Sequence, residues 1–364
     1  MTVTKPKAAV PTADTLSKSL ASTLSSITTS LSHLSLPPSS SDALPSAPES
    51  LSESFLHLLH SLKQTTTSLS LSFKPPITIP AAIQQLDKLS DQLGRLITCV
   101  VLLSSSRGAL YEEWNDGVLA LGEDIKRYLG NFQHKQEENG NEEYLRHTGI
   151  VWDAIDKLTL GLSRTENEAV GRKWKSQQEV MKDAWVEFKE FLAEQADGGE
   201  DDEKDDEEDE EEENDEWGGL GEEKLSVEET ARTEAAKSLL SLHQILHATI
   251  PRYLPLLTLS PDVPYSPLMS SSSEIIAAFD TAISCMYPQQ DEDDIEAALR
   301  DLDTKSAALV KAVRARLALV DSAKAEEAAA CRSFLDRWET RVAVESTKWR
   351  ERRLSLSSLS QALE

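Results

Sequence analysis

Apolar residues recur at steps of three and four along most of the chain, which is the spacing of amphipathic helices. The clearest stripe, over residues 83–103, has the heptad rhythm that packs one helix against others in a bundle. Its members are Leu86, Leu89, Leu93, Leu96, Val100 and Leu103. Similar stripes predict helices over residues 16–34, 51–69, 107–132, 144–162, 166–195, 226–250, 273–287, 295–320 and 331–349. No alternating strand pattern, hairpin turn or βαβ rhythm occurs, so the predicted fold is all-α, with two antiparallel helical bundles.

Two helix starts are marked by capping residues. Ser226 is followed three positions later by Glu229, the capping-box pattern in which each side chain satisfies a free backbone amide of the other residue. Asp291–Asp294 places acids at the positive start of the next helix. We therefore expect helices to begin at both places.

An acidic run divides the sequence. Residues 197–216 hold sixteen carboxylates and one lysine, so about −15 of the formal net charge of −26 falls in this segment. Like charges at this density disfavour compact structure. We expect a disordered acidic linker over residues 197–221, between an N-terminal bundle at 50–196 and a C-terminal bundle at 222–364.

Residues 1–49 are predicted to form a separate region before the first bundle. They contain a helix covered with serine and threonine, followed by a proline- and serine-rich stretch at Leu36–Ser50. Proline removes backbone donors and prevents a helix from passing through this stretch. We expect the first helix to dock loosely.

Composition narrows the class of partner and the compartment. An isoelectric point near 4.7 argues against direct binding of nucleic acid or anionic lipid, because both need a basic surface. The longest apolar run, Ile97–Leu103, is too short to span a bilayer. Three widely separated cysteines and the lack of an apolar leader at the start favour reduced thiols and a cytoplasmic and nuclear location. Proteins are therefore the expected partners, with basic proteins as candidates for the acidic run.

Candidate chemistry is sparse. His243 and His247 stand four residues apart, a spacing by which two imidazoles can hold one metal ion, but no third ligand accompanies them. His57 and His60 stand three residues apart and also lack a third ligand. No nucleophile elbow, phosphate loop or dinucleotide-binding motif occurs. We therefore predict no catalytic, cofactor-binding or metal-binding residues, and hence no enzyme.

Tryptophans and short motifs supply the remaining candidates for binding. Six tryptophans lie on or beside apolar stripes and are predicted to be buried: Trp114, Trp152, Trp174, Trp185, Trp338 and Trp349. Trp217 stands at the end of the acidic run and is a candidate anchor for a basic partner. Arg300–Leu302 spells a cyclin-docking pattern, but we expect Leu302 to be buried. Ser260–Pro261 and Ser266–Pro267 are minimal sites for proline-directed phosphorylation.

Three short segments carry recognisable motifs: Thr148-Gly-Ile-Val-Trp-Asp-Ala154, Val180-Met-Lys-Asp-Ala184 and Ser284-Cys-Met-Tyr-Pro288. In this order, they resemble the T-G-V-V-W-E-A segment, the helix before the acidic segment and the S-M-Y-P helix end of the cyclin-D-binding, Grap2-interacting protein family. The matching positions are Thr148, Gly149, Val151, Trp152, Lys182, Asp183, Met286, Tyr287 and Pro288.

The resemblance implies a two-lobed helical interaction protein, nuclear and cytoplasmic, that acts in cell-cycle control through protein contacts, with a cyclin as a possible partner. The alternative is an acidic chaperone for basic proteins such as histones, in which residues 197–216 supply the binding charge. Salt distinguishes the two hypotheses, because binding through the acidic run weakens steeply with ionic strength.

Overall fold

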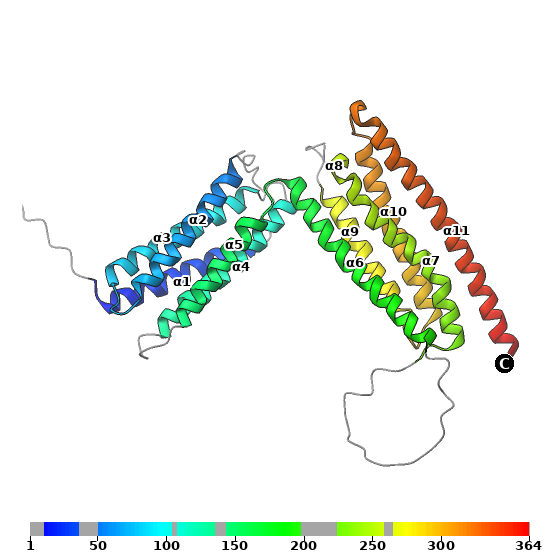
Figure 1. Ribbon diagram of the computed structural model, residues 1–364, viewed down its shortest axis with the longest axis horizontal. Helices are drawn as coiled ribbons and strands as arrows, with labels where there is room; N and C mark the ends of the chain where they lie inside the picture. Colours follow the sequence, from blue (N-terminus) through cyan, green and yellow to red (C-terminus); the bar gives the residue numbers. More distant parts are fainter. Residues whose placement is uncertain are drawn as a thin grey trace, which may run out of the picture. The chain divides into compact units, whose positions relative to one another are not determined.

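The computed structural model describes residues 11–35, 50–103, 108–134, 143–197, 224–257 and 265–363. Every regular element in these ranges is a helix, which confirms the predicted all-α fold (Figure 1). None of these helices is long and apolar enough to cross a membrane. The chain divides into two compact units, Met1–Ala169 and Val170–Glu364.

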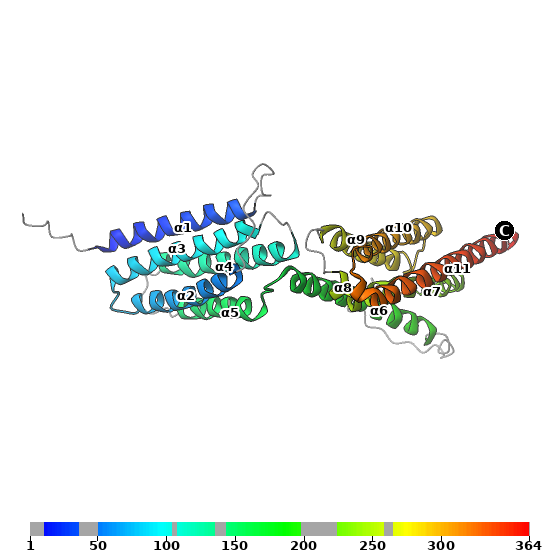
Figure 2. The same ribbon diagram turned by 90° about the horizontal axis from the view of Figure 1, so that it is seen from above.

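The first unit is a four-helix bundle with a fifth helix on one side. Its helices are α1 (Ala13–Ser35), α2 (Leu51–Ser72), α3 (Ile79–Leu103), α4 (Ala109–His134) and α5 (Glu143–Gly161). Helices α2, α3, α4 and α5 each pack against the next, and α5 packs back against α2, which closes the ring. Helix α1 packs against α3 and α4 (Figure 2). The structure thus places α1 inside the first compact unit, whereas the sequence suggested a separate, loosely docked region.

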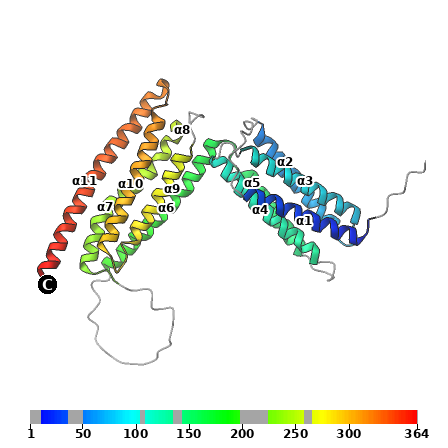
Figure 3. The ribbon, with the colours of Figure 1, turned by 180° about the vertical axis from the view of Figure 1, so that it is seen from behind.

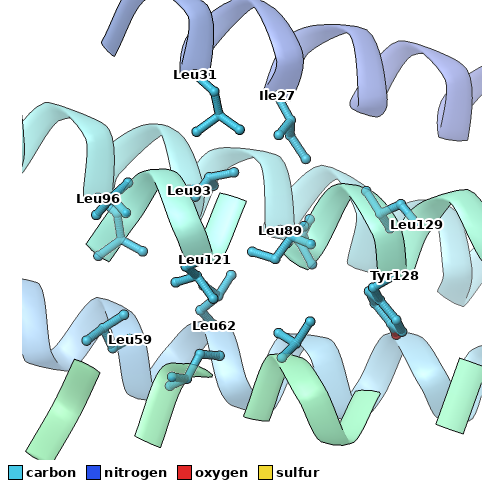
Figure 4. Packing of buried hydrophobic residues seen from close by; sticks show 14 of the residues in the cluster. Ile27, Leu31, Leu59, Leu62, Leu89, Leu93, Leu96, Leu121, Tyr128 and Leu129 are labelled. Atoms are coloured by element: carbon cyan, nitrogen blue, oxygen red, sulfur yellow. The ribbon is translucent and has the colours of Figure 1, made fainter. Parts of the chain in front are cut away.

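The core of the first unit is built from the predicted leucine stripes. Leu89, Leu93 and Leu96 of α3 are at most 1% exposed and lie beneath Ile27 and Leu31 of α1 (Figure 4). Burial of aliphatic side chains from neighbouring helices is the main force that holds such a bundle together.

The second unit contains α6 to α11. Its helices are α6 (Glu166–Asp197, whose first residues belong to the first unit), α7 (Val227–Thr249), α8 (Leu254–Leu257), α9 (Ser266–Ser284), α10 (Glu292–Leu317) and α11 (Ala325–Leu363), with short 3-10 turns at Ile250–Tyr253 and Ser322–Lys324. Helix α11 runs along α7 and α10, and α6 lies at the other side of this unit (Figure 3). Both predicted helix starts are confirmed: Ser226 and Glu229 form a capping box, and Asp291 accepts from the amides of Asp293 and Asp294.

The boundary between the units differs from the expected one. The sequence suggested a division after residue 196, but the units divide at Ala169 and Val170, within the first turn of α6. Aromatic residues on α6 contact aromatic residues of the second unit: Trp185 contacts Phe279 of α9, and Phe191 contacts Tyr287 in the turn after α9. An apolar stripe shows that a helix will be covered without showing by which neighbours, so the pattern on α6 left its partners open.

The acidic run connects two helices of the second unit, α6 and α7. Residues 198–223, including the predicted disordered linker, lie outside the described residues. Gln195, before this segment, and Leu225, after it, are hydrogen-bonded: the amide of Leu225 donates to the side-chain oxygen of Gln195 at 2.9 Å.

Candidate functional site

The Thr148–Ala154 motif lies on α5, and its residues point in two directions. Thr148 and Val151 are buried in the first unit, whereas Trp152 is 36% exposed. Trp152 directly follows Val151, and one residue turns a helix by about 100°. The predicted burial of Trp152 is therefore wrong, because an inward Val151 places the next side chain at the surface. No heavy atom lies within 4 Å of where a Cβ on Gly149 would be, so α5 has an open backbone face there.

Thr148 belongs to a buried cluster of hydroxyl groups. The oxygen of Ser70 on α2 lies 2.7 Å from both the Tyr128 hydroxyl on α4 and the Thr148 hydroxyl on α5. Thr148 also donates to the carbonyl of Tyr144, and Tyr128 donates to that of Thr66. The cluster ties three helices of the first unit together at a fixed register, because buried polar groups need their partners.

We expect Tyr128→Phe to lower the free energy of unfolding of the first unit by about 1 kcal/mol or more, because the buried hydroxyl loses its contacts with the Ser70 hydroxyl and the Thr66 carbonyl. The double variant Tyr128→Phe, Ser70→Ala should lose less than the sum of the single changes, since both remove the same contact. Urea denaturation followed by circular dichroism measures this cycle. Strictly additive effects would show that the cluster does not act as a unit.

The other motif residues lie in the second unit. Lys182 and Asp183 are exposed on α6. Met286 is fully buried after the end of α9, and Tyr287 is half-buried against Phe191. Pro288 is half-buried in the turn before α10. The structure therefore does not gather the nine motif residues into one site: some support the core and others face solvent.

The two histidines of α7 are buried and face different helices. The Nδ1 atom of His243 lies 2.8 Å from the Ser306 hydroxyl on α10, and its Nε2 atom lies 3.1 Å from a carboxylate oxygen of Asp303. The Nε2 atom of His247 lies 2.7 Å from the Ser272 hydroxyl on α9. No group of three potential metal ligands occurs in the described part of the chain, and each ring has its own hydroxyl partner.

Ser306, His243 and Asp303 contain the three side-chain types of a hydrolytic triad, but their placement fits a structural role. A nucleophilic serine must reach a substrate, and Ser306 is fully buried in the middle of α10. Asp303 lies one turn before it, and its second carboxylate oxygen, Oδ2, accepts a hydrogen bond from the Ser346 hydroxyl of α11 at 3.3 Å. The cluster thus joins α7, α10 and α11.

His247 is enclosed on a second side by α6. The ring of Trp174 stacks on it with centroids 4.9 Å apart, and the indole nitrogen donates to the His247 carbonyl at 3.2 Å. Ser272 in turn donates to the side-chain oxygen of Gln177 at 2.7 Å. This burial lowers the pKa of His247 to about 4, because the charged imidazolium loses its hydration.

The lowered pKa of His247 predicts that the second unit loses stability in mild acid. Below about pH 6.5 the unfolded chain binds a proton at this residue, whereas the folded chain does so only near pH 4. The free energy of unfolding therefore has its full value above pH 6.5. It falls by on the order of 3 kcal/mol as the pH is lowered to 4. Urea denaturation between pH 7 and pH 4 measures the loss.

His247→Gln is the matched control for this pH dependence, because glutamine offers a polar atom to Ser272 but does not titrate. The free energy of unfolding of this variant should change less over the same pH range than that of the wild type. Equal slopes for both proteins would contradict the assignment to His247.

The remaining candidates have separate outcomes. Leu302 is fully buried, as predicted for the cyclin-docking pattern, and Arg300 pairs with Glu296. Ser266 is exposed at the start of α9. Trp217, Ser260 and Pro261 lie outside the described residues. The buried contacts of His243, His247 and Thr148 were missed by sequence reasoning, since their partners lie on helices distant in sequence.

A family model described as "Grap2 and cyclin-D-interacting, N-terminal" matches residues 54–194. The match begins in α2 and ends in α6, so it contains the closed ring of the first unit and does not include α1. It includes two of the three motif segments, Thr148–Ala154 and Val180–Ala184, and confirms the resemblance inferred from them, whereas Ser284–Pro288 lies outside the match. Comparison with curated proteins finds no match.

Proposed function

Because residues 54–194 belong to the Grap2 and cyclin-D-interacting N-terminal domain family, we propose that the protein is a helical adaptor that binds a D-type cyclin or another cell-cycle regulator. The adaptor acts in the nucleus and cytoplasm, catalyses no reaction and holds no cofactor. The single observation that carries this proposal is the family match, which covers the four-helix ring of the first unit.

The surface of the first unit supports the proposal. Helix α5 carries Leu145, Trp152 and Leu160 with exposed side chains, and exposed aromatic and aliphatic residues are the usual anchors of protein interfaces. A closed helical bundle holds such residues at fixed positions, which lowers the entropic cost of binding. The buried hydroxyl and imidazole groups of both units contact side chains of neighbouring helices, which supports a structural role for them.

The test is direct binding of the purified full-length chain to a purified D-type cyclin. We expect saturable binding by the wild type and its loss in Leu93→Asp, which disrupts the first unit. Leu319→Asp, the same change at an exposed leucine of the second unit, should leave binding intact. Absence of saturable binding by the wild type, or unchanged binding by Leu93→Asp, would contradict the proposal.

A further inference from the structure

Helix α1 lies outside the closed ring of the first unit. Helices α2 to α5 complete a four-helix bundle by their own contacts, and α1 adds to the face formed by α3 and α4. The family match starts at residue 54, after α1. Residues 36–49 join α1 to α2 and lie outside the described residues. The ring therefore has a complete set of helix–helix contacts before α1 is added.

The sequence of α1 gives it little helical stability of its own. Twelve of its 23 residues are serine or threonine, which favour the helix less than alanine does. The hydroxyls of Thr28, Ser32 and Ser35 donate to carbonyls one turn back in the same helix, where they compete with backbone bonds. Helices of this length and composition form mainly through packing. The face of α3 and α4 thus induces the helix that covers it.

The groove formed by α3 and α4 fits one kind of helix. It accepts an apolar stripe at helical spacing whose buried members are Leu16, Leu20, Ile27, Leu31 and Leu34. Gly122 of α4 forms a notch for one of them: a Cβ built there would lie 2.5 Å from a methyl carbon of Leu31. Ile27 and Leu31 point from α1 toward Leu93 of α3 (Figure 4). A ligand of this groove must therefore be an amphipathic helix with a branched aliphatic residue opposite Gly122.

We propose that α1 is a displaceable cover, and that the groove on α3 and α4 binds an amphipathic partner helix with the same stripe in its place. The inference rests on the proposed adaptor function for the existence of a partner. It adds the surface, the kind of segment that binds and the competition with α1. Because α1 is tethered, its effective concentration at the groove is high, on the order of millimolar. A partner helix must therefore bind the groove more tightly than the tethered α1 does, or bind after another change has weakened the contact between α1 and the groove.

The test uses the full-length chain and a fluorescent synthetic peptide of residues 13–35 as the probe. The release variant Ile27→Asp, Leu31→Asp removes α1 from the groove and leaves the groove residues unchanged. We expect it to bind the peptide saturably, at least roughly tenfold more tightly than the wild type, whose groove is occupied by the tethered α1. Adding Gly122→Val to the release variant fills the notch and should weaken binding by at least about tenfold. Fluorescence anisotropy measures all three proteins.

Hydrogen exchange on the same variants separates displacement from unfolding. In the release variant, amides of α1 should lose protection while those of α2 to α5 keep it. Loss of protection throughout α2 to α5 would overturn the proposal, because α1 would then be an integral part of the core. Retained protection without peptide binding, or equal binding by the wild type and the release variant, would also overturn it.

A wild-type dimer abolished by the release substitutions would identify a second copy of this chain as the occupant, which contradicts a partner helix. No cyclin is present, so failure here leaves the adaptor proposal standing.

Discussion

Leu93→Asp is expected to unfold the first unit. The side chain is 1% exposed and lies at the centre of α3, beneath α1. The substitution removes aliphatic packing and places a carboxyl group without a partner in the core, with an expected cost on the order of 4 kcal/mol or more. That is most of the stability of a typical small domain. Thermal melting by circular dichroism should show loss of one part of the helical signal, and limited proteolysis should cut within residues 50–165.

Leu71→Asp is the matched control for this prediction. Leu71 lies in the last turn of α2 in the same unit and is 66% exposed, so the same substitution should change the free energy of unfolding by about 0.5 kcal/mol or less. An unchanged melting profile for Leu93→Asp would contradict the packing of α3 described above.

Trp174→Ala is expected to destabilise the second unit by about 3–5 kcal/mol, because a large buried aromatic ring is deleted. The change also removes the stacking on His247 and the hydrogen bond to its carbonyl. Since α6 packs with the second unit, hydrogen exchange should increase in α7 and α9 while α2 to α5 remain protected. Urea denaturation gives the magnitude.

Trp152→Ala provides the comparison, because it deletes the same side chain from the surface of α5. We expect it to change the free energy of unfolding by less than about 1 kcal/mol. If Trp174→Ala instead increased exchange in α2 to α5, the division of the chain at Ala169 and Val170 would be wrong.

The sequence predicted those features that depend on residues close together in the chain. The stripe of Leu86, Leu89, Leu93 and Leu96 indicated a core helix, and these residues form the buried face of α3. The Ser226–Glu229 capping box also appeared where it was expected. Both patterns have local causes: helical periodicity and the needs of a helix start.

Features that depend on contacts between distant residues could not be predicted in this way. The stripe on α6 contains Trp174, but only the fold shows that this residue packs on His247, 73 positions later. In the same way, Thr148 was noted as part of a motif, yet its role follows from Ser70 on another helix. Trp152 illustrates the limit of periodicity itself, because one position along α5 separates a buried side chain from an exposed one.

We propose that the folded helices, rather than the acidic run, carry partner binding. The most direct test is the affinity of the full-length chain for a D-type cyclin at low and at physiological ionic strength, with and without residues 197–216. We expect salt and the deletion each to change the affinity by less than roughly threefold, since contacts through packed apolar surfaces are weakly screened. An affinity that collapses at physiological salt and disappears on deletion would contradict it and favour an acidic chaperone of basic proteins.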